Sequence, residues 1–388
     1  MKKIIILLLL LSNNMARSQN IPLSGIVRDS ETMALLPFVN IVFDESDQST
    51  STGSITNENG EFTINSTVNK VAFSHINYES LLVTLHEINN EIFLKPKNYI
   101  LDEIVVSKIS TRDYLKKILK SSTAKIEKNT RLKSYCREIV KVNNNYTKFS
   151  DALVDYYIKK GNGKSNIQLT EHRALKSKNY NPESERIVDN LNSAFNVKDY
   201  VKNAYDFDGL ERLLKSKEYD FIRKLKKEAN GEEYEYIQIV PDSNSKLMLS
   251  EGYVIIDPKT KSILEFKIYS AESHLHNSKL FNIWIAKAQV KNILNWTKFR
   301  YVNNQYILIY NRKQAEIYLK MGTKINDTFN FTSDVFVYEF KNNIPMPAEG
   351  YDKGTIFEAG TNFKEEYWKK YNSFPLSGME EKFINSVQ

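Results

Sequence analysis

The sequence predicts a mainly β protein, with an N-terminal two-sheet β-sandwich followed by an α+β domain that contains a large, curved antiparallel sheet. Three observations lead to this fold class. About seven short apolar or alternating runs, separated by turn residues, fill the first hundred residues, which is typical of a sandwich. Paired runs joined by turn residues recur beyond residue 131. Helical spacing of apolar residues is confined to 110–128 and to interruptions around 182–216.

The first 18 residues have the layout of a secretory signal. Two lysines precede an unbroken apolar run over 4–11, and small residues stand three and one positions before Gln19. The apolar run is far shorter than the ~20 residues that cross a membrane as a helix. The only cysteine is Cys136, so we expect no lipid anchor at a cleaved N-terminus and no internal disulfide. The chain is therefore predicted to be exported to the periplasm or to associate with the outer membrane, and not to be a lipoprotein.

The chain divides into a signal peptide (1–18), a sandwich (19–107), a linker helix (108–130) and an α+β domain (131–388). The charge differs sharply between these parts. Residues 19–106 carry 12 acidic and 4 basic groups, and the chain beyond them has a net charge of +12. This asymmetry fits either an anionic partner of the basic part or a solvated, lysine-rich surface. No lysine and arginine cluster interleaved with aromatic residues is present, so nucleic acid is not an expected partner.

The sandwich is predicted from alternating runs whose apolar residues share one face, as Phe62 and Ile64 do. A tight turn is expected at 57–60, because asparagine and glycine tolerate positive φ. The predicted strands are Gly25–Arg28, Phe38–Phe43, Glu61–Asn65, Val71–Ile76, Leu81–Leu85, Glu91–Leu94 and Ile100–Val106.

Five stretches of this module resemble the carboxypeptidase regulatory-like domain: Gly25–Asp29, Leu36–Ile41, Gly53–Phe62, Phe73–Tyr78 and Leu101–Val106. The resemblance covers about residues 21–106. It departs from the family pattern at Asn77, where a glycine is usual, and at Asn57, where an aspartate is usual, and both replacements suit a turn.

The resemblance implies a transthyretin-like or immunoglobulin-like sandwich that assists folding or interaction and carries no catalytic residue. This form of the domain is common in envelope proteins of Bacteroidetes, including the N-terminal extensions of TonB-dependent outer-membrane receptors.

The linker helix is predicted to begin with a capping box, because Ser110 is followed three residues later by Asp113. Its apolar stripe consists of Leu115, Ile118, Leu119 and Ile126. We expect this stripe to pack on the chain's own sheet, the alternative being a partner-binding face.

The α+β domain is predicted from antiparallel hairpins. They pair Phe221–Lys227 with Tyr234–Val240 across Asn230-Gly231, Tyr253–Ile256 with Ile263–Tyr269, and Tyr301-Val302 with Gln305–Tyr310 across Asn303-Asn304, and Val335–Phe340 is a further strand. In one strand Leu264, Phe266 and Ile268 are expected to face the core, with Glu265 and Lys267 on the solvent side.

This second region resembles uncharacterised Bacteroidetes proteins in which the same sandwich comes first. The resemblance rests on Tyr135–Glu138, Gly252–Asp257 and Tyr367–Asn372. The hairpin after Gly252–Asp257 also resembles that of periplasmic lipoprotein carriers, whose curved sheet cups an acyl chain.

No motif for catalysis is present, and we predict no catalytic residue and no cofactor. None of the five histidines has a glutamate three residues later, and no Gly-x-Ser-x-Gly sequence occurs. Cys136 lies in an apolar strand without a nearby histidine. The weak metal candidates are His274 and His276, which would share a face in a strand, whereas a polar loop would leave both solvated. The acidic run 44–47 is a calcium candidate or an exposed loop.

We therefore predict an exported, non-enzymatic envelope protein that binds other envelope proteins or an apolar or anionic envelope ligand, without a transmembrane helix after signal cleavage. Two alternatives stay open: a periplasmic lipid-carrier-like protein, and a hydrolase of cell-wall or peptide substrates. A deep apolar cavity favours the carrier, a buried cluster of perturbed acids or histidines favours the enzyme, and a flat aromatic or basic face favours docking.

Overall fold

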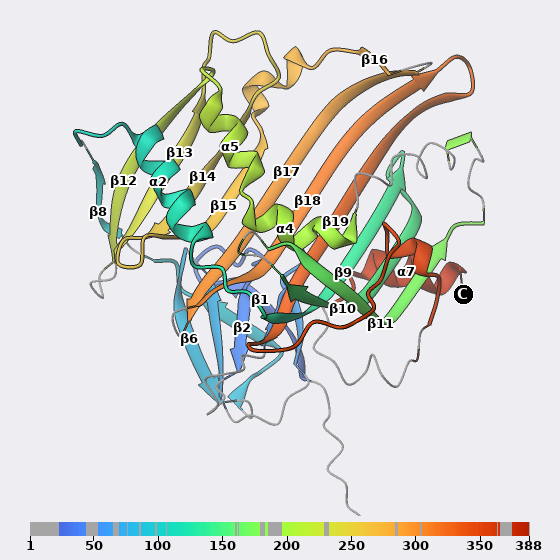
Figure 1. Ribbon diagram of the computed structural model, residues 1–388, viewed down its shortest axis with the longest axis horizontal. Helices are drawn as coiled ribbons and strands as arrows, with labels where there is room; N and C mark the ends of the chain where they lie inside the picture. Colours follow the sequence, from blue (N-terminus) through green and yellow to red (C-terminus); the bar gives the residue numbers. More distant parts are fainter. Residues whose placement is uncertain are drawn as a thin grey trace, which may run out of the picture.

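The computed structural model describes residues 23–43, 53–64, 70–75, 77–84, 87–97, 99–105, 107–159, 161, 163–178, 183–184, 196–228, 233–283, 286–302, 305–362, 364 and 375–387. Three sheets and a small number of helices make up this part of the chain (Figure 1). The predicted mainly β fold class is confirmed. The signal segment, the acidic run 44–47, the turns Asn230-Gly231 and Asn303-Asn304, and the stretch Tyr367–Asn372 lie outside the described residues.

The strands of the sandwich are β1 (Leu23–Asp29), β2 (Asn40–Phe43), β3 (Gly53–Ile55), β4 (Glu61–Ile64), β5 (Lys70–His75), β6 (Tyr78–Thr84) and β7 (Glu91–Leu94). They form one sheet in the order β4-β1-β7 and a second in the order β3-β2-β5-β6. Apolar residues from both sheets, among them Val27, Phe62 and Phe73, are buried between them. The two-sheet sandwich is thus as predicted, with the short β3 as an addition.

The large sheet contains β8 (Tyr99–Ile104), β9 (Arg131–Val142), β10 (Asn145–Ile158), β11 (Ser165–Lys176), β12 (Tyr219–Glu228), β13 (Glu233–Pro241), β14 (Ser250–Asp257), β15 (Ser262–Ser270), β16 (Phe281–Ile283), β17 (Ala286–Val302), β18 (Gln305–Met321) and β19 (Ile325–Lys341). Its order is β11-β10-β9-β19-β18-β17-β15-β14-β13-β12-β8, and β16 pairs with β17. All pairings are antiparallel, and each predicted hairpin is present.

One prediction about the sandwich is wrong. The run Ile100–Val106, expected as its last strand, forms β8, which pairs with β12 at the edge of the large sheet. An alternating strand offers the same hydrogen-bonding groups to either sheet. The sequence alone therefore does not indicate which sheet it joins.

Three helices, α2 (Thr111–Thr123), α4 (Tyr200–Tyr205) and α5 (Asp208–Lys215), lie across one face of the large sheet in Figure 1, and we call this the helix face. The remaining helices within the described residues are η4 (Val197–Asp199), η5 (Glu272–Asn277), η6 (Phe357–Ala359) and α7 (Gly378–Val387), of which α7 packs on the opposite face, against Ile139 and Phe149. The side chain of Ser110 accepts a hydrogen bond from the Asp113 amide, and Leu115, Ile118 and Leu119 are buried in the main core. The capping box and the packing of this helix on its own sheet are confirmed.

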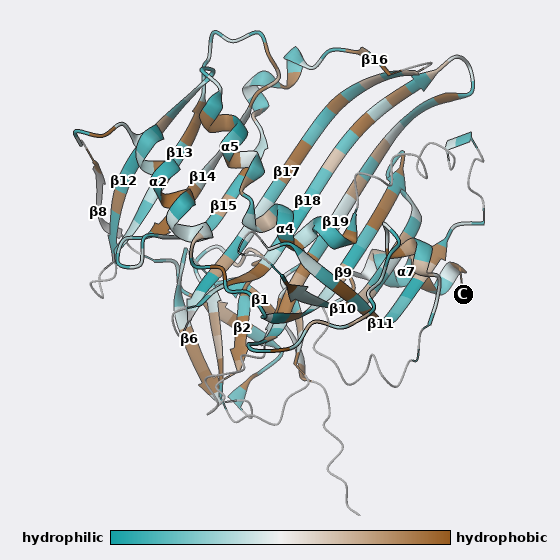
Figure 2. Cartoon of the chain, viewed as in Figure 1, coloured by the Kyte–Doolittle hydropathy of each residue, from teal (hydrophilic) through white to brown (hydrophobic). Residues whose placement is uncertain are grey.

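The sandwich packs on the opposite face, which we call the sandwich face. The Phe38 ring lies 4.9 Å from Trp296 and 5.0 Å from Tyr310, centroid to centroid. The Lys298 ammonium donates to the Phe38 carbonyl at 2.8 Å. Figure 2 shows hydrophilic and hydrophobic residues alternating along β17–β19, as a sheet with two differently covered faces requires.

Covering the sandwich face changes the environment of the strand predicted to be solvated on one side. Glu265 is buried, and it accepts hydrogen bonds from Tyr253 and from the Trp296 indole. A register shift between Ile255 and Ile256 places Leu264 in the crevice beside Glu265, so it does not share the core face with Phe266. The strand is therefore buried on both sides, and that part of the prediction is wrong.

The C-terminal helix α7 packs against β10 and β11 through Phe383 and Ile384. No helix within the described residues is long and apolar enough to cross a membrane.

Candidate ligand-binding pocket

A pocket of about 560 Å³ lies on the helix face, between α4–α5 and the long strands of the large sheet. The helices contribute Asn203, Asp208, Gly209, Arg212 and Leu213. The sheet contributes Ser250, Ile268, Ile293, Leu294, Asn295, Lys313, Gln314, Ala315, Ile317, Phe331 and Ser333. Its volume falls within the ~300–1,000 Å³ typical of small-molecule sites.

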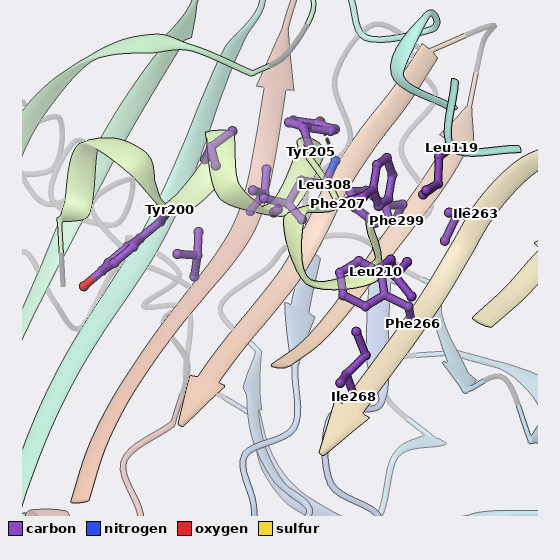
Figure 3. Packing of buried hydrophobic residues seen from close by; sticks show 14 of the residues in the cluster. Leu119, Tyr200, Tyr205, Phe207, Leu210, Ile263, Phe266, Ile268, Phe299 and Leu308 are labelled. Carbon is purple, nitrogen blue, oxygen red and sulfur yellow. Dashed lines mark hydrogen bonds between the residues drawn. The ribbon is translucent and has the colours of Figure 1, made fainter. Parts of the chain in front are cut away.

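Local packing fixes the helices that roof this pocket. The Tyr205 hydroxyl accepts a hydrogen bond from the Leu308 backbone amide at 2.7 Å, and this bond ties the end of α4 to β18. Phe207 precedes α5 in the left-handed conformation (φ 51°) and packs 5.9 Å from the Phe266 ring. In Figure 3, Phe207 and Leu210 lie over the sheet beside Phe266. A conformation that a bulky residue seldom adopts is held here by aromatic packing.

The other end of α5 is held from α2. The guanidinium group of Arg112 donates to the carbonyls of Leu214 and Ser216, at 2.6 and 2.8 Å, where α5 ends. Gly209 allows α5 to approach the sheet, since an added Cβ would lie 3.3 Å from the Asn295 side chain. The pocket is therefore bounded by elements that are fixed at both ends.

The strand register arranges the pocket's sheet wall as rungs, meaning residues paired across adjacent strands and facing the same side. One rung is polar and runs through Asn295, Lys313, Ser333 and Glu138. The next two rungs are apolar: Ile293, Ala315, Phe331 and Val140, then Val290, Ile317, Phe329 and Val142. Polar groups thus lie at one end of the wall, and the wall beyond them is apolar.

Lys313 is the cation of the polar rung. It is half-buried, and among the described residues no hydrogen bond or salt bridge reaches its ammonium group. Burial lowers its pKa, Asp208 on α5 acts in the opposite direction, and Arg212 adds to the lowering. A partly desolvated cation without a partner is costly. An anionic group in the pocket would offset that cost.

Glu138 closes the polar rung and has a different environment. Its carboxylate accepts hydrogen bonds from the Tyr200 hydroxyl at 2.7 Å, from the Ile356 backbone amide at 3.1 Å and from the Ser150 hydroxyl at 3.2 Å. Burial raises its pKa to about 7, against these hydrogen bonds, which lower it. Both carboxylate oxygens of Glu138 accept hydrogen bonds, from Tyr200 of α4 and from the Ile356 backbone, and these bonds tie both segments to β9. The geometry therefore gives Glu138 a structural role.

A second hollow, of about 330 Å³, lies between the sandwich and the large sheet. Lys298, Glu265 and His75 are among its lining residues. Both charged groups are already hydrogen-bonded, Lys298 to the Phe38 carbonyl and Glu265 to the Trp296 indole. This crevice therefore contains the contacts that join the two domains.

The structure also places the residues singled out from the sequence. His274 and His276 lie on the 3₁₀ helix η5 and not in a strand. His274 is buried, with its ring nitrogens 2.9 Å from the Ser273 hydroxyl and 3.0 Å from the Asp242 carbonyl. Within the described residues, no three histidine, cysteine, aspartate or glutamate side chains are grouped as metal ligands. Cys136 is buried in β9, 3.6 Å from the Tyr156 hydroxyl, and burial raises its thiol pKa.

Lys313 was not among the site residues predicted from the sequence. A signal was nevertheless present, because alternation along β18 puts Lys313 on the same side as Ala315, Ile317 and Leu319. A lysine in register with a core-facing apolar series is unusual.

Comparison with known proteins assigns part of the chain. Residues 23–106 match the CarboxypepD_reg-like domain, so the resemblance of the N-terminal module is confirmed, and the region that follows has no family assignment. No curated protein matches the chain.

Two solved structures are distantly similar to this chain. One is a DUF1329 family protein from Desulfovibrio piger, 8% identical, covering 62% of this chain and 96% of its own, with a TM-score of 0.27. The other is lipovitellin, in a study of its lipid–protein interactions, 8% identical, covering 65% of this chain and 29% of its own, with a TM-score of 0.28.

Proposed function

We propose that this chain is an exported, non-enzymatic cell-envelope protein that binds an amphiphile in the pocket beneath α5. The anionic head group lies at Lys313 and the apolar tail lies along Ala315 and Ile317. The observation that carries this proposal is the unpartnered Lys313 ammonium at the boundary between a polar and two apolar rungs. The sandwich braces the other face of the sheet and contributes no chemistry.

Export is part of the proposal and rests on the layout of residues 1–18. Expression with this segment in a bacterium, followed by fractionation and mass measurement, should give a periplasmic or envelope-associated chain that begins at Gln19. An uncleaved cytoplasmic chain would contradict this part.

Binding is tested with 11-(dansylamino)undecanoic acid, whose fluorescence rises on transfer to an apolar site. We expect saturable binding that Ala315→Phe weakens at least about tenfold, because the added ring fills the tail region and a lost factor of ten is 1.4 kcal/mol. Ala315→Ser, which keeps the space, is the matched control. Saturable binding that both variants retain would place the probe elsewhere and overturn the assignment of the pocket.

The hydrolase alternative has a separate test. Native mass spectrometry of the protein from its own envelope, followed by denaturing analysis, identifies what is released. An intact acyl-bearing anion supports binding without turnover. A truncated product in its place would favour the enzyme.

A further inference from the structure

Exposed apolar side chains gather at one end of the large sheet. Thirteen large hydrophobic side chains are exposed among the described residues, and six of them lie between 247 and 293. These six are Leu247, Leu275, Leu280, Phe281, Ile283 and Ile293. Soluble surfaces scatter such residues singly, so a cluster indicates an interaction site.

Hydrogen bonds hold this cluster together as one surface, which we call the rim (residues 245–249, 272–283 and 286–293). The Asn277 amide donates to the carbonyls of Ser245 and Leu247, both at 3.3 Å. The Gln289 amide donates to the Ser278 carbonyl at 2.7 Å. Figure 1 shows β16 beside the start of β17, at the end of the sheet away from the sandwich.

The rim is continuous with the pocket. Ile293 lines the pocket and is also 37% exposed at the rim. Phe281 is paired with Ala288, which is paired with Leu319 of the main core. Paired residues face the same side, so Phe281 extends the apolar helix face to the edge strand β16.

Charge indicates what kind of partner the rim fits. Its exposed charged side chains are Lys246, Lys279, Lys287 and Lys291 against the single acid Glu272. Apolar side chains surrounded by lysines are typical of segments that lie in the interface of an anionic bilayer.

We propose that the rim docks on an anionic phospholipid surface, which brings the open side of the pocket to the lipid head groups for uptake or delivery of the amphiphile. The side chains of Phe281 and Ile283 enter the interface, and the lysines contact the phosphates. This inference rests on the proposed function for its purpose, although docking itself is tested without any pocket ligand.

The test is flotation of the mature full chain with phosphatidylcholine vesicles, with and without phosphatidylglycerol. We expect binding only when phosphatidylglycerol is present, and a loss of at least about tenfold on raising the salt from low to high, because several lysine–phosphate contacts are screened. Phe281→Ser with Ile283→Ser should reduce binding at least about tenfold through the apolar area lost. Leu82→Ser, a 57% exposed apolar residue of the sandwich, is the control and should bind as the wild type does.

Three results would overturn the proposal: no binding to either vesicle, binding that the paired rim variant retains, or a dimer in analytical ultracentrifugation that the rim variant dissociates. The last would make a second copy the occupant, through the exposed edge of β16. The rim variant should still bind dansylaminoundecanoic acid in vesicle-free buffer. Its failure to do so would mean that the variant damages the pocket, and Lys279→Glu with Lys287→Glu then serves as the second rim variant.

Discussion

The two faces of the large sheet differ in whether their buried basic side chains have a partner. On the sandwich face, the Arg137 guanidinium is paired with Glu380 at 3.0 Å, and Arg173 with Asp151 at 2.6 Å. On the helix face, Lys313 has no such partner within the described part of the chain. Both faces belong to one sheet, so the difference lies in what covers each face.

This contrast separates structural charges from a charge that is available to a ligand. A buried pair specifies how two elements fit, because removing either partner leaves the other unpaired. A half-buried cation without a partner does not specify how two elements fit, and its desolvation lowers the stability of the folded state. Variants of Arg137, Glu138 and Lys313 test that distinction.

The largest effect is expected for Arg137→Ala, which should lower the free energy of unfolding by about 3–5 kcal/mol because Glu380 is left buried and unpaired. Arg137 is only 1% exposed. Urea denaturation followed by circular dichroism measures the change. The exposed pair Arg28–Glu91 is the control, and Arg28→Ala should cost no more than about 1 kcal/mol.

If Arg137→Ala fails to fold, the double variant Arg137→Met with Glu380→Leu, which removes both charges, can be measured in its place. The double variant should recover most of the stability, since no charge is then left unpaired. A single variant as stable as the wild type would mean that the paired face does not depend on its pairs, and the contrast between faces would fail.

The second effect concerns pH. The pKa of Glu138 is raised from 4.5 to about 7 by burial, so the folded chain holds a proton that the unfolded chain releases in this range. The stabilising contribution is fully present below about pH 4.5 and is lost as pH rises through about 7. Relative to Glu138→Gln, the wild type should lose about 3 kcal/mol of unfolding free energy between these values. Parallel stability curves for the two proteins would show that the carboxyl titrates normally.

Local signals in the sequence predicted much of the fold. Ser110 and Asp113 placed the start of α2, and the runs Tyr253–Ile256 and Ile263–Tyr269 placed the hairpin of β14 and β15. Each of these features is decided by residues close together in the chain. The short motifs of the N-terminal module, taken in order, likewise predicted its family resemblance, and residues 23–106 match the CarboxypepD_reg-like domain.

Features that depend on distant pairing were not predictable in the same way. The strand β8 follows the sandwich in sequence, yet it joins β12, more than a hundred residues later. The burial of Glu265 depends on the sandwich lying over β15, which alternation within the strand does not reveal. The pocket depends most on such pairing, because the registers of β17, β18 and β19 bring Asn295, Lys313 and Ser333 into one rung.

The smallest effect is the most specific, because it separates charge from packing at Lys313. Lys313→Gln should weaken binding of dansylaminoundecanoic acid about tenfold, or 1.4 kcal/mol, and should leave binding of its methyl ester unchanged. Lys313→Arg keeps a cation and should retain most of the affinity for the acid. In contrast to Arg137→Ala, Lys313→Gln should be at least as stable as the wild type, since no partner loses a contact. Equal losses for acid and ester would reduce Lys313 to a packing role, and a stability loss approaching that of Arg137→Ala would mean that the helix face, too, pairs its buried charge.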